Sequence, residues 1–177
     1  MDETFHAGNS NNAPHIASLS FPFASHPMPL FMLACRLLIA APDVMFSFFG
    51  TATSNGQIFK NINKCLENLK AYDVDDGIPK NNVFTSTIQE QMELFMAVTP
   101  WNFKKGIEVA MLERRRKITC LMSDAFYWFC GDIAVEIGIP WIAASLAGDC
   151  SLTTHVYTNL IHSTIGVGPN GNYNQLD

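Results

Sequence analysis

The sequence predicts an α/β protein with a Rossmann-like, doubly wound parallel sheet. Short apolar segments rich in Ile, Val and Phe alternate with longer segments of helical periodicity along most of the 177 residues. This alternation is typical of βαβ units, whose right-handed crossovers place helices on both faces of the sheet. The default strand order for such a sheet is 3-2-1-4-5.

The first predicted strand covers residues 15–21, and the helix that follows covers residues 30–41. Pro27 and Pro29 suit the first turn of this helix, where a missing N–H group costs nothing. The turn between strand and helix carries Ser25 and His26, and it lies where open α/β sheets bind their ligands.

The later elements repeat the same alternation. Strands are predicted at 44–51, 66–72, 118–123 and 141–145, and helical segments at 58–65, 87–116, 125–137 and 148–165. We expect a turn at 52–57, around Asn55-Gly56, because this dipeptide is a turn signal. We also expect Pro100 to break the long helical segment into two helices.

The composition is that of a folded domain with a sizeable core. Hydrophobic residues make up 48% of the chain and charged residues 15%. The net charge of −5 argues against a nucleic-acid partner. No apolar run is long enough for an integral membrane segment, and the first residues lack the pattern of a signal peptide. The five cysteines are scattered without a C-x-x-C pair, so we expect no metal site and a cytoplasmic location with reduced thiols.

Two titratable residues are predicted to meet at one edge of the sheet. His26 follows the first strand and Asp124 ends the fourth, and the order 3-2-1-4-5 makes these strands neighbours. Histidine can take a proton from a substrate hydroxyl, and a carboxylate on its other ring nitrogen would stabilise the imidazolium that forms. The alternative interpretation is structural, with both residues capping helices.

Aromatic residues gather near the same two strand ends, where those lining a crevice would suit a flat aromatic ligand and the others would be core. They are Phe21, Phe23, Phe126, Tyr127, Trp128 and Phe129. The chain contains no G-x-S-x-G elbow, G-x-G-x-x-G fingerprint or P-loop. A serine hydrolase, a dinucleotide-binding protein and a P-loop NTPase are therefore disfavoured.

Six segments occur in this order along the chain: LSFPFASHPMPLF, FSFFGTATSN, YDVDDGIP, QEQMELF, SDAFYWF and AGDCSLTTHVY. Together they resemble the amino-terminal half of plant family-1 UDP-glycosyltransferases of the flavonoid (anthocyanidin and flavonol) 3-O-glucosyltransferase type. The resemblance implies the amino-terminal, acceptor-binding domain of a GT-B fold over residues 15–165, after a disordered tail at 1–14 and before a loop at 166–177. It implies a UDP-sugar as co-substrate, a flavonoid acceptor and no cofactor.

The resemblance also implies roles for eight residues in an inverting transfer, in which the acceptor hydroxyl attacks the anomeric carbon of the sugar. The general base would be His26, in the FPFxxHxxP motif, supported by Asp124 of the (A/S)DAF motif. The acceptor contacts would be Gln89, Phe126, His155 and Phe21, and the donor-proximal residues Ser25 and Gly148.

The chain departs from the family pattern in two respects. Leu146 stands where the family usually has a threonine that faces the sugar, and the UDP-binding box and the carboxyl-terminal domain are absent. We therefore expect a truncated form with negligible turnover, whose parent moves glucose or galactose to the 3-hydroxyl of a flavonoid. The alternatives are a non-catalytic module that binds a flavonoid or a partner, and a flavodoxin-like domain, which the missing glycine-rich phosphate loop disfavours.

Overall fold

The computed structural model describes residues 13–23, 25–60, 67–78, 87–145, 153–154 and 156–166. Contacts divide the chain into two compact units, Met1–Ala144 and Ser145–Asp177. In its described part the second unit contains α6 (Thr158–Ile161) and a π-helical turn, His162–Gly166. Over the described ranges, no helix combines the length and apolar character needed to cross a membrane.

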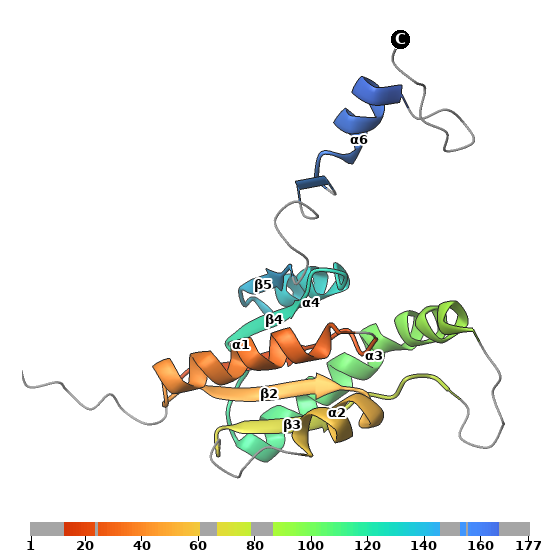
Figure 1. Cartoon of the computed structure of the whole chain (residues 1–177). Helices are drawn as coiled ribbons and strands as arrows, with labels where there is room; N and C mark the ends of the chain where they lie inside the picture. The colour runs from red at the N-terminus through yellow and green to blue at the C-terminus, as the bar shows by residue number, and fades with distance from the viewer. Residues whose placement is uncertain are drawn as a thin grey trace, which may run out of the picture. The chain divides into compact units, whose positions relative to one another are not determined.

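The first unit alternates strands and helices. In chain order these are β1 (His15–Leu19), α1 (Pro27–Ala40), β2 (Met45–Gly50), α2 (Ala52–Phe59), β3 (Leu69–Asp73), α3 (Ile88–Arg114), β4 (Cys120–Asp124), α4 (Phe129–Ile137) and β5 (Trp141–Ala144). The five strands form one parallel sheet in the order β3-β2-β1-β4-β5 (Figure 1). The predicted α/β class and strand order are confirmed, and each predicted strand occurs with ends shifted by a few residues.

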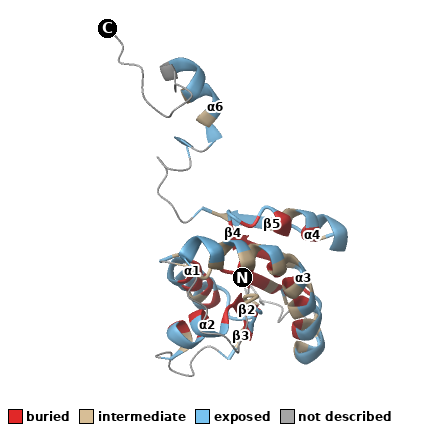
Figure 2. Ribbon diagram, turned by 90° about the vertical axis from the view of Figure 1, so that its right-hand side faces the viewer, coloured by how far each residue is buried: buried red, intermediate tan, exposed pale blue. Residues whose placement is uncertain are grey.

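Helices cover both faces of the sheet, with α1 and α2 on one side and α3 on the other (Figure 2). On the first face, the Phe31 ring of α1 lies 5.7 Å from the Phe48 ring of β2 and 5.2 Å from the Phe59 ring of α2. Successive strand residues point to opposite faces, so Phe49 projects to the other side. Strand β2 therefore supplies aromatic rings to both cores, which explains its continuous apolar sequence.

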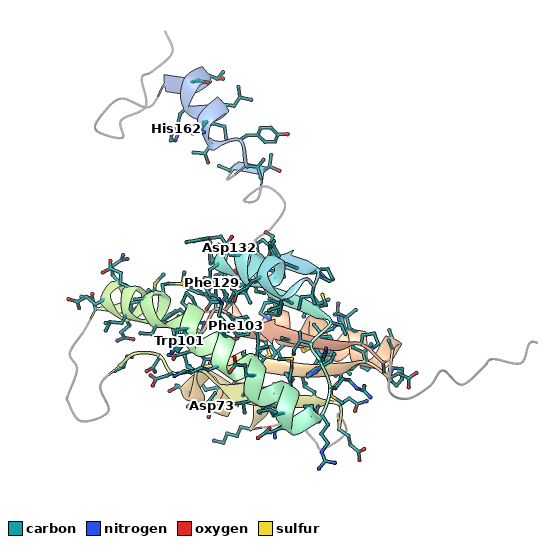
Figure 3. All side chains as sticks on the ribbon, turned by 180° about the vertical axis from the view of Figure 1, so that it is seen from behind. Asp73, Trp101, Phe103, Phe129, Asp132 and His162 are labelled. Atoms are coloured by element: carbon teal, nitrogen blue, oxygen red, sulfur yellow. The ribbon has the colours of Figure 1, made fainter. Side chains whose placement is uncertain are left out.

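The larger core lies beneath α3 and α4, which contribute Phe103 and Phe129 (Figure 3). The rings of Phe49 and Phe103 pack edge to face, with centroids 5.1 Å apart and planes at 79°. Gly106 of α3 lies against the same Phe49 ring, and a Cβ at this position would come within 2.9 Å of it. The missing side chain therefore lets α3 approach β2 closely.

The predicted turn at 52–57 is wrong, because Ala52–Phe59 forms α2. Of the helical segment predicted at 58–65, only Ile58 and Phe59 are helical among the described residues, and they end α2. The helix begins at Thr51, whose hydroxyl accepts a hydrogen bond from the Ser54 amide at 3.2 Å. Threonine is a favourable N-cap residue because it satisfies one of the free amides of the first turn. Residues 61–66 lie outside the described part of the chain.

Asn55 explains why the turn signal failed. Its side chain is buried inside α2, and its amide donates to the Tyr72 carbonyl at 3.0 Å and to the Asp73 carboxylate at 2.8 Å. Asparagine favours turns because its side chain bonds to nearby backbone. Here the side chain bonds to β3 and, at 3.3 Å, to the Gly50 carbonyl of β2, so it supports the helix on the sheet and not a turn.

The predicted break at Pro100 is wrong, because α3 runs through it without interruption. A proline inside a helix removes one backbone hydrogen bond. Packing on either side offsets this loss, since Phe95 and Phe103 are both fully buried. The helix also begins with a capping box in which the Thr87 and Glu90 side chains each accept the other's amide.

The helix predicted from residue 125 begins later, at Phe129. Residues 125–128 instead form a turn, in which the Tyr127 amide donates to the Asp124 carbonyl at 3.0 Å. The delay leaves four residues between the end of β4 and the start of α4, and Phe126 among them lies beside the site described below.

A buried histidine lies at the amino-terminal end of the central strand, β1. His15 begins β1 and has no exposed surface. Its Nδ1–H donates to the Arg116 carbonyl at 3.1 Å, so Nε2 accepts from the Ser47 hydroxyl at 2.8 Å. Burial lowers the pKa of His15, and the nearby charges of Arg114 and Arg116 add to the effect. The folded protein therefore holds this imidazole neutral.

We expect the free energy of unfolding to decrease as the pH falls below 6.5, the ordinary pKa of histidine. The unfolded chain then binds a proton that folded His15 resists, which costs up to about 1.4 kcal/mol per pH unit until the lowered pKa is reached. Urea unfolding between about pH 5 and pH 7.5 measures this slope. His15→Gln should flatten it, whereas His162→Gln, at an exposed position, should not. Identical slopes in the two variants would contradict the explanation.

Candidate active site

His26 stands at the junction between β1 and α1. It occupies the N-cap position of α1, but its side chain makes no capping hydrogen bond. Pro27 and Pro29 follow in the first helical turn, where they remove two of the amides that a cap would satisfy. The imidazole is therefore free to point toward the neighbouring strand.

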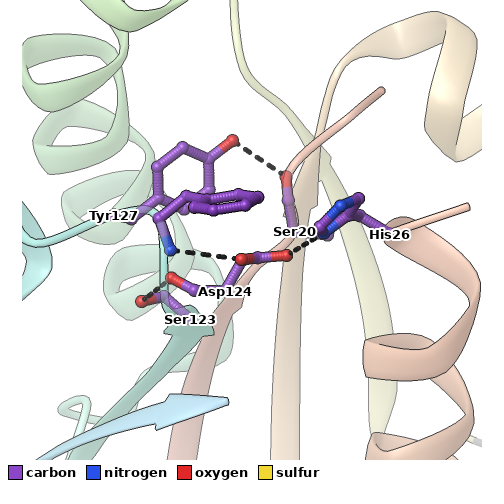
Figure 4. Close-up of polar contacts among 6 residues, drawn as sticks. Ser20, His26, Ser123, Asp124 and Tyr127 are labelled. Atoms are coloured by element: carbon purple, nitrogen blue, oxygen red, sulfur yellow. Dashed lines mark hydrogen bonds and ion pairs between the residues drawn. The ribbon is translucent and has the colours of Figure 1, made fainter. Parts of the chain in front are cut away.

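The His26 imidazole is hydrogen-bonded to Asp124, the last residue of β4. Nδ1 of His26 lies 2.7 Å from Oδ2 of Asp124 (Figure 4). The histidine side chain is 25% exposed and the aspartate side chain 3% exposed. The structure thus brings together the two residues that the strand order predicts to be neighbours. One partner is accessible to a ligand and the other is not.

Further hydrogen bonds hold the aspartate in place. Its Oδ1 accepts from the Phe126 amide at 3.2 Å, so each carboxylate oxygen has a partner. The N-cap of α4 is Trp128, so Asp124 does not cap that helix. The structural alternative, in which both residues cap helices, is therefore wrong for Asp124. His26 occupies an N-cap position but its side chain makes no capping hydrogen bond.

This geometry fixes the tautomer of His26. A carboxylate only accepts, so Nδ1 must carry the hydrogen that points at Asp124. In the neutral ring Nε2 then presents a lone pair, and it has no hydrogen-bond partner in the described part of the chain. The dyad therefore offers a proton acceptor whose conjugate acid a buried carboxylate would stabilise.

Two phenylalanine rings flank the imidazole. The Phe21 ring meets the His26 ring edge-on at 5.3 Å and 76°, and the Phe126 ring lies 5.2 Å away at 41°. The two phenylalanines also contact each other at 5.4 Å. Phe21 is buried, whereas Phe126 is 49% exposed. Phe126 can therefore present a flat apolar face to a ligand beside Nε2.

The other predicted site residues either make no hydrogen bond to the dyad or lie outside the described residues. Ser25 is exposed next to His26 in sequence. Gln89 is exposed in the first turn of α3, where its side-chain amide donates to the Glu93 carboxylate at 2.8 Å. No hydrogen bond between described residues joins either one to His26. Gly148 and His155, like Leu146, lie outside the described part of the chain.

Sequence reasoning missed a second layer of contacts behind Asp124. The Trp141 indole N–H donates to the Ser123 hydroxyl at 2.9 Å, and that hydroxyl donates to the Asp124 carbonyl at 3.1 Å. Ser123 opens the (A/S)DAF motif but Trp141 belongs to none of the quoted segments, and only the pairing of β4 with β5 places them together. Within the described ranges, no cluster of three or more His, Cys, Asp or Glu residues could hold a metal ion.

No protein-family model matches the chain. It is 44% identical over 155 residues to an anthocyanidin 3-O-glucosyltransferase of Vitis vinifera, a match that covers 87% of the chain and 34% of that relative. It is also 44% identical over 155 residues to a flavonol 3-O-glucosyltransferase of Arabidopsis thaliana, covering 86% of the chain and 34% of the relative. The chain therefore spans about a third of the length of these relatives.

Solved structures agree with these matches. The crystal structure of a UDP-glucose:anthocyanidin 3-O-glucosyltransferase in complex with UDP superimposes with a TM-score of 0.80 at 34% identity, over 89% of this chain and 35% of that one. A Phytolacca americana glycosyltransferase with UDP-2-fluoro-glucose and pterostilbene gives a TM-score of 0.66 at 14% identity, over 87% and 35% of the two chains. At that identity the second match shows the shared fold alone.

The sheet and its neighbours in solved structures define the class: the chain has the fold of the amino-terminal part of a GT-B glycosyltransferase. Within that class it is a homologue of the plant family-1 UDP-glycosyltransferases of the anthocyanidin and flavonol 3-O-glycosyltransferase type. The predicted fold class and the resemblance stated from the sequence are both confirmed.

We expect Asp124→Asn to reverse the tautomer of His26. The asparagine oxygen would keep the Phe126 amide, which leaves the NH₂ group facing Nδ1 of His26. Because two donors cannot face each other, Nδ1 should become an acceptor and the ring proton should move to Nε2. The ring ¹⁵N chemical shifts of His26 measure this change, with the exposed His162 as an internal control. Retention of the Nδ1–H form would contradict the hydrogen-bonding scheme.

Proposed function

We propose that the chain is the acceptor-binding part of a glycosyltransferase that moves glucose or galactose from a UDP-sugar to the 3-hydroxyl of a flavonoid, with inversion. The observation that carries the proposal is the His26–Asp124 hydrogen bond of 2.7 Å, with Nε2 left open beside an exposed aromatic ring. The names of the relatives supply the substrates, since they are anthocyanidin and flavonol 3-O-glycosyltransferases.

In this proposal His26 is the general base. Nε2 takes the proton of the acceptor hydroxyl as that oxygen bonds to the anomeric carbon of the sugar. The bond from that carbon to the UDP oxygen breaks on the opposite side, so the configuration inverts and UDP leaves with the electron pair. Asp124 stabilises the imidazolium through Nδ1–H and does not itself take the proton.

The environment of the dyad favours an acceptor with an aromatic ring next to its hydroxyl. Phe126 would stack against, or pack edge-on to, a flat ring that presents its hydroxyl to Nε2. Phe21 packs against both Phe126 and His26. Gln89 and His155 are proposed to contact the acceptor further out.

The contacts with the sugar donor are proposed from the family resemblance. Ser25 and Gly148 would lie near the sugar, and the rest of the donor site belongs to the part of the relatives that this chain does not span. A cytoplasmic location is part of the proposal, supported by Cys35, Cys120 and Cys130, which are free thiols. The proposed displacement uses a base, the acceptor and the UDP-sugar as co-substrate, and no cofactor is proposed.

One observation favours a second candidate, binding without turnover. The chain spans about a third of its relatives' length, and the His26–Asp124 pair proposed to receive the acceptor lies within this third. A module of this kind would bind flavonoids, or pair with another protein, without catalysis. Separate binding and transfer measurements distinguish the two candidates.

We expect the 177-residue chain to bind the flavonol quercetin, with quenching of its tryptophan fluorescence as the measurement. Phe126→Ala should raise the dissociation constant by about 2- to 10-fold, because a lost aromatic contact is worth roughly 0.5–1.5 kcal/mol. The control is Val135→Ala on α4, which removes a side chain that is 83% exposed. An absence of quenching up to the solubility limit of quercetin would contradict the acceptor site.

Fused to the remaining sequence of the Vitis vinifera relative, the chain should transfer glucose from UDP-glucose to quercetin. In that fusion His26→Ala should reduce kcat by about 10³-fold, since general base catalysis contributes roughly 10²–10⁴. Leu112→Ala, at a residue of α3 that is 78% exposed, is the matched control. Undiminished transfer by a folded His26→Ala fusion would rule out the base. A fusion that binds quercetin but never transfers glucose would favour the binding module.

A further inference from the structure

We propose that Tyr127 is a positioning residue, whose hydroxyl holds the carboxyl ends of β1 and β4 at the separation that the His26–Asp124 hydrogen bond requires. Tyr127 acts through these residues and does not itself contact a reacting atom. The inference rests on the proposed function for its catalytic meaning. The effect of Tyr127 on the geometry of the His26–Asp124 hydrogen bond can be measured without turnover.

The regular pairing of β1 with β4 stops just before the site. The last paired residues are Leu19 and Ser123, so Ser20 and Asp124 lie beyond the ladder. His26 lies further along the same connection, next to α1. The Ser20 amide still donates to the Phe49 carbonyl of β2 at 3.0 Å, but the pairing of β1 with β4 does not extend to Ser20 and Asp124. The distance between the two members of the dyad is therefore not set by that pairing.

Tyr127 supplies such contacts to both strand ends. Its hydroxyl donates to the Ser20 carbonyl at 3.3 Å (Figure 4), and its amide donates to the Asp124 carbonyl at 3.0 Å. One residue is thus bonded to the first residue after β1 and to the last residue of β4. Tyr127 and Ser20 are both fully buried, so water does not compete for the hydroxyl bond.

The tyrosine ring extends this connection to the imidazole. It lies 5.8 Å from the Phe21 ring, which follows Ser20 in the chain and meets the His26 ring at 5.3 Å. A displacement of Ser20 would therefore move Phe21 and His26 relative to Asp124, because close-packed side chains transmit such shifts. Burial holds the pKa of the Tyr127 phenol well above its ordinary value, so the hydroxyl remains a donor.

Tyr72 provides a matched control. It is also buried, at 8% exposure, and it lies on β3, which β2 and β1 separate from β4. Its buried hydroxyl lies near the side chains of Glu113 and Ser47, and among the described residues it makes no hydrogen bond to the dyad. Tyr72→Phe and Tyr127→Phe each remove one oxygen from a buried ring, but only the second removes a bond to the site.

The experiment follows the Nδ1–H proton of His26 by NMR in the ¹⁵N-labelled 177-residue chain. In Tyr127→Phe this proton should move upfield and exchange with water at least about tenfold faster, because the two strand ends are no longer held together. In Tyr72→Phe both its position and its exchange rate should match the unmodified chain. An unchanged signal in folded Tyr127→Phe would overturn the proposal.

A second measurement applies if Tyr127→Phe does not fold. Labelling Tyr72→Phe with 3-fluorotyrosine keeps the Tyr127 hydroxyl and makes it a stronger donor, so the His26 signal should again shift. A signal that stays in place would overturn the positioning role. Quercetin binding is measured on the same samples: a chain that responds as expected but binds no quercetin refutes the proposed function and leaves the positioning role intact.

Discussion

The parallel pairing of β1 with β4 is the constraint on which the site depends. His26 and Asp124 are 98 positions apart in sequence, and α1, β2, α2, β3 and α3 all intervene between their strands. Parallel neighbours bring their carboxyl ends to one edge of the sheet, so pairing alone delivers both side chains to one place. The 2.7 Å contact then requires only that the two strand ends be held without slippage.

The core supports this arrangement from one side. The aromatic cluster under α3 and α4 continues from Phe95 through Tyr127 to Phe21, and only Phe126 at its end is widely exposed. The site is thus the outer margin of the main core. A rigid support of this kind suits a base that must be placed accurately beside its substrate.

The order of the strands could be predicted from the sequence, but the places where distant contacts outweigh a local turn or break signal could not. Alternating apolar segments give the strand order, and the strand order brings His26 to Asp124. The errors at α2 and Pro100 arose where a local turn or break signal was outweighed by distant partners. Asn55 is bound to β3, and Phe103 of α3 packs against Phe49 of β2. The Tyr127–Ser20 bond has no sequence signature, because its acceptor is a backbone carbonyl.

The two prolines at the start of α1 have a consequence for which ligand this junction can take. Helix starts after the first strand of a sheet commonly hold phosphate through their free amides. Pro27 and Pro29 remove two such amides, and His26 occupies the position just before them. The junction is thereby poorly suited to an anion and well suited to an uncharged hydroxyl, which separates it chemically from the nucleotide sites built on the same topology.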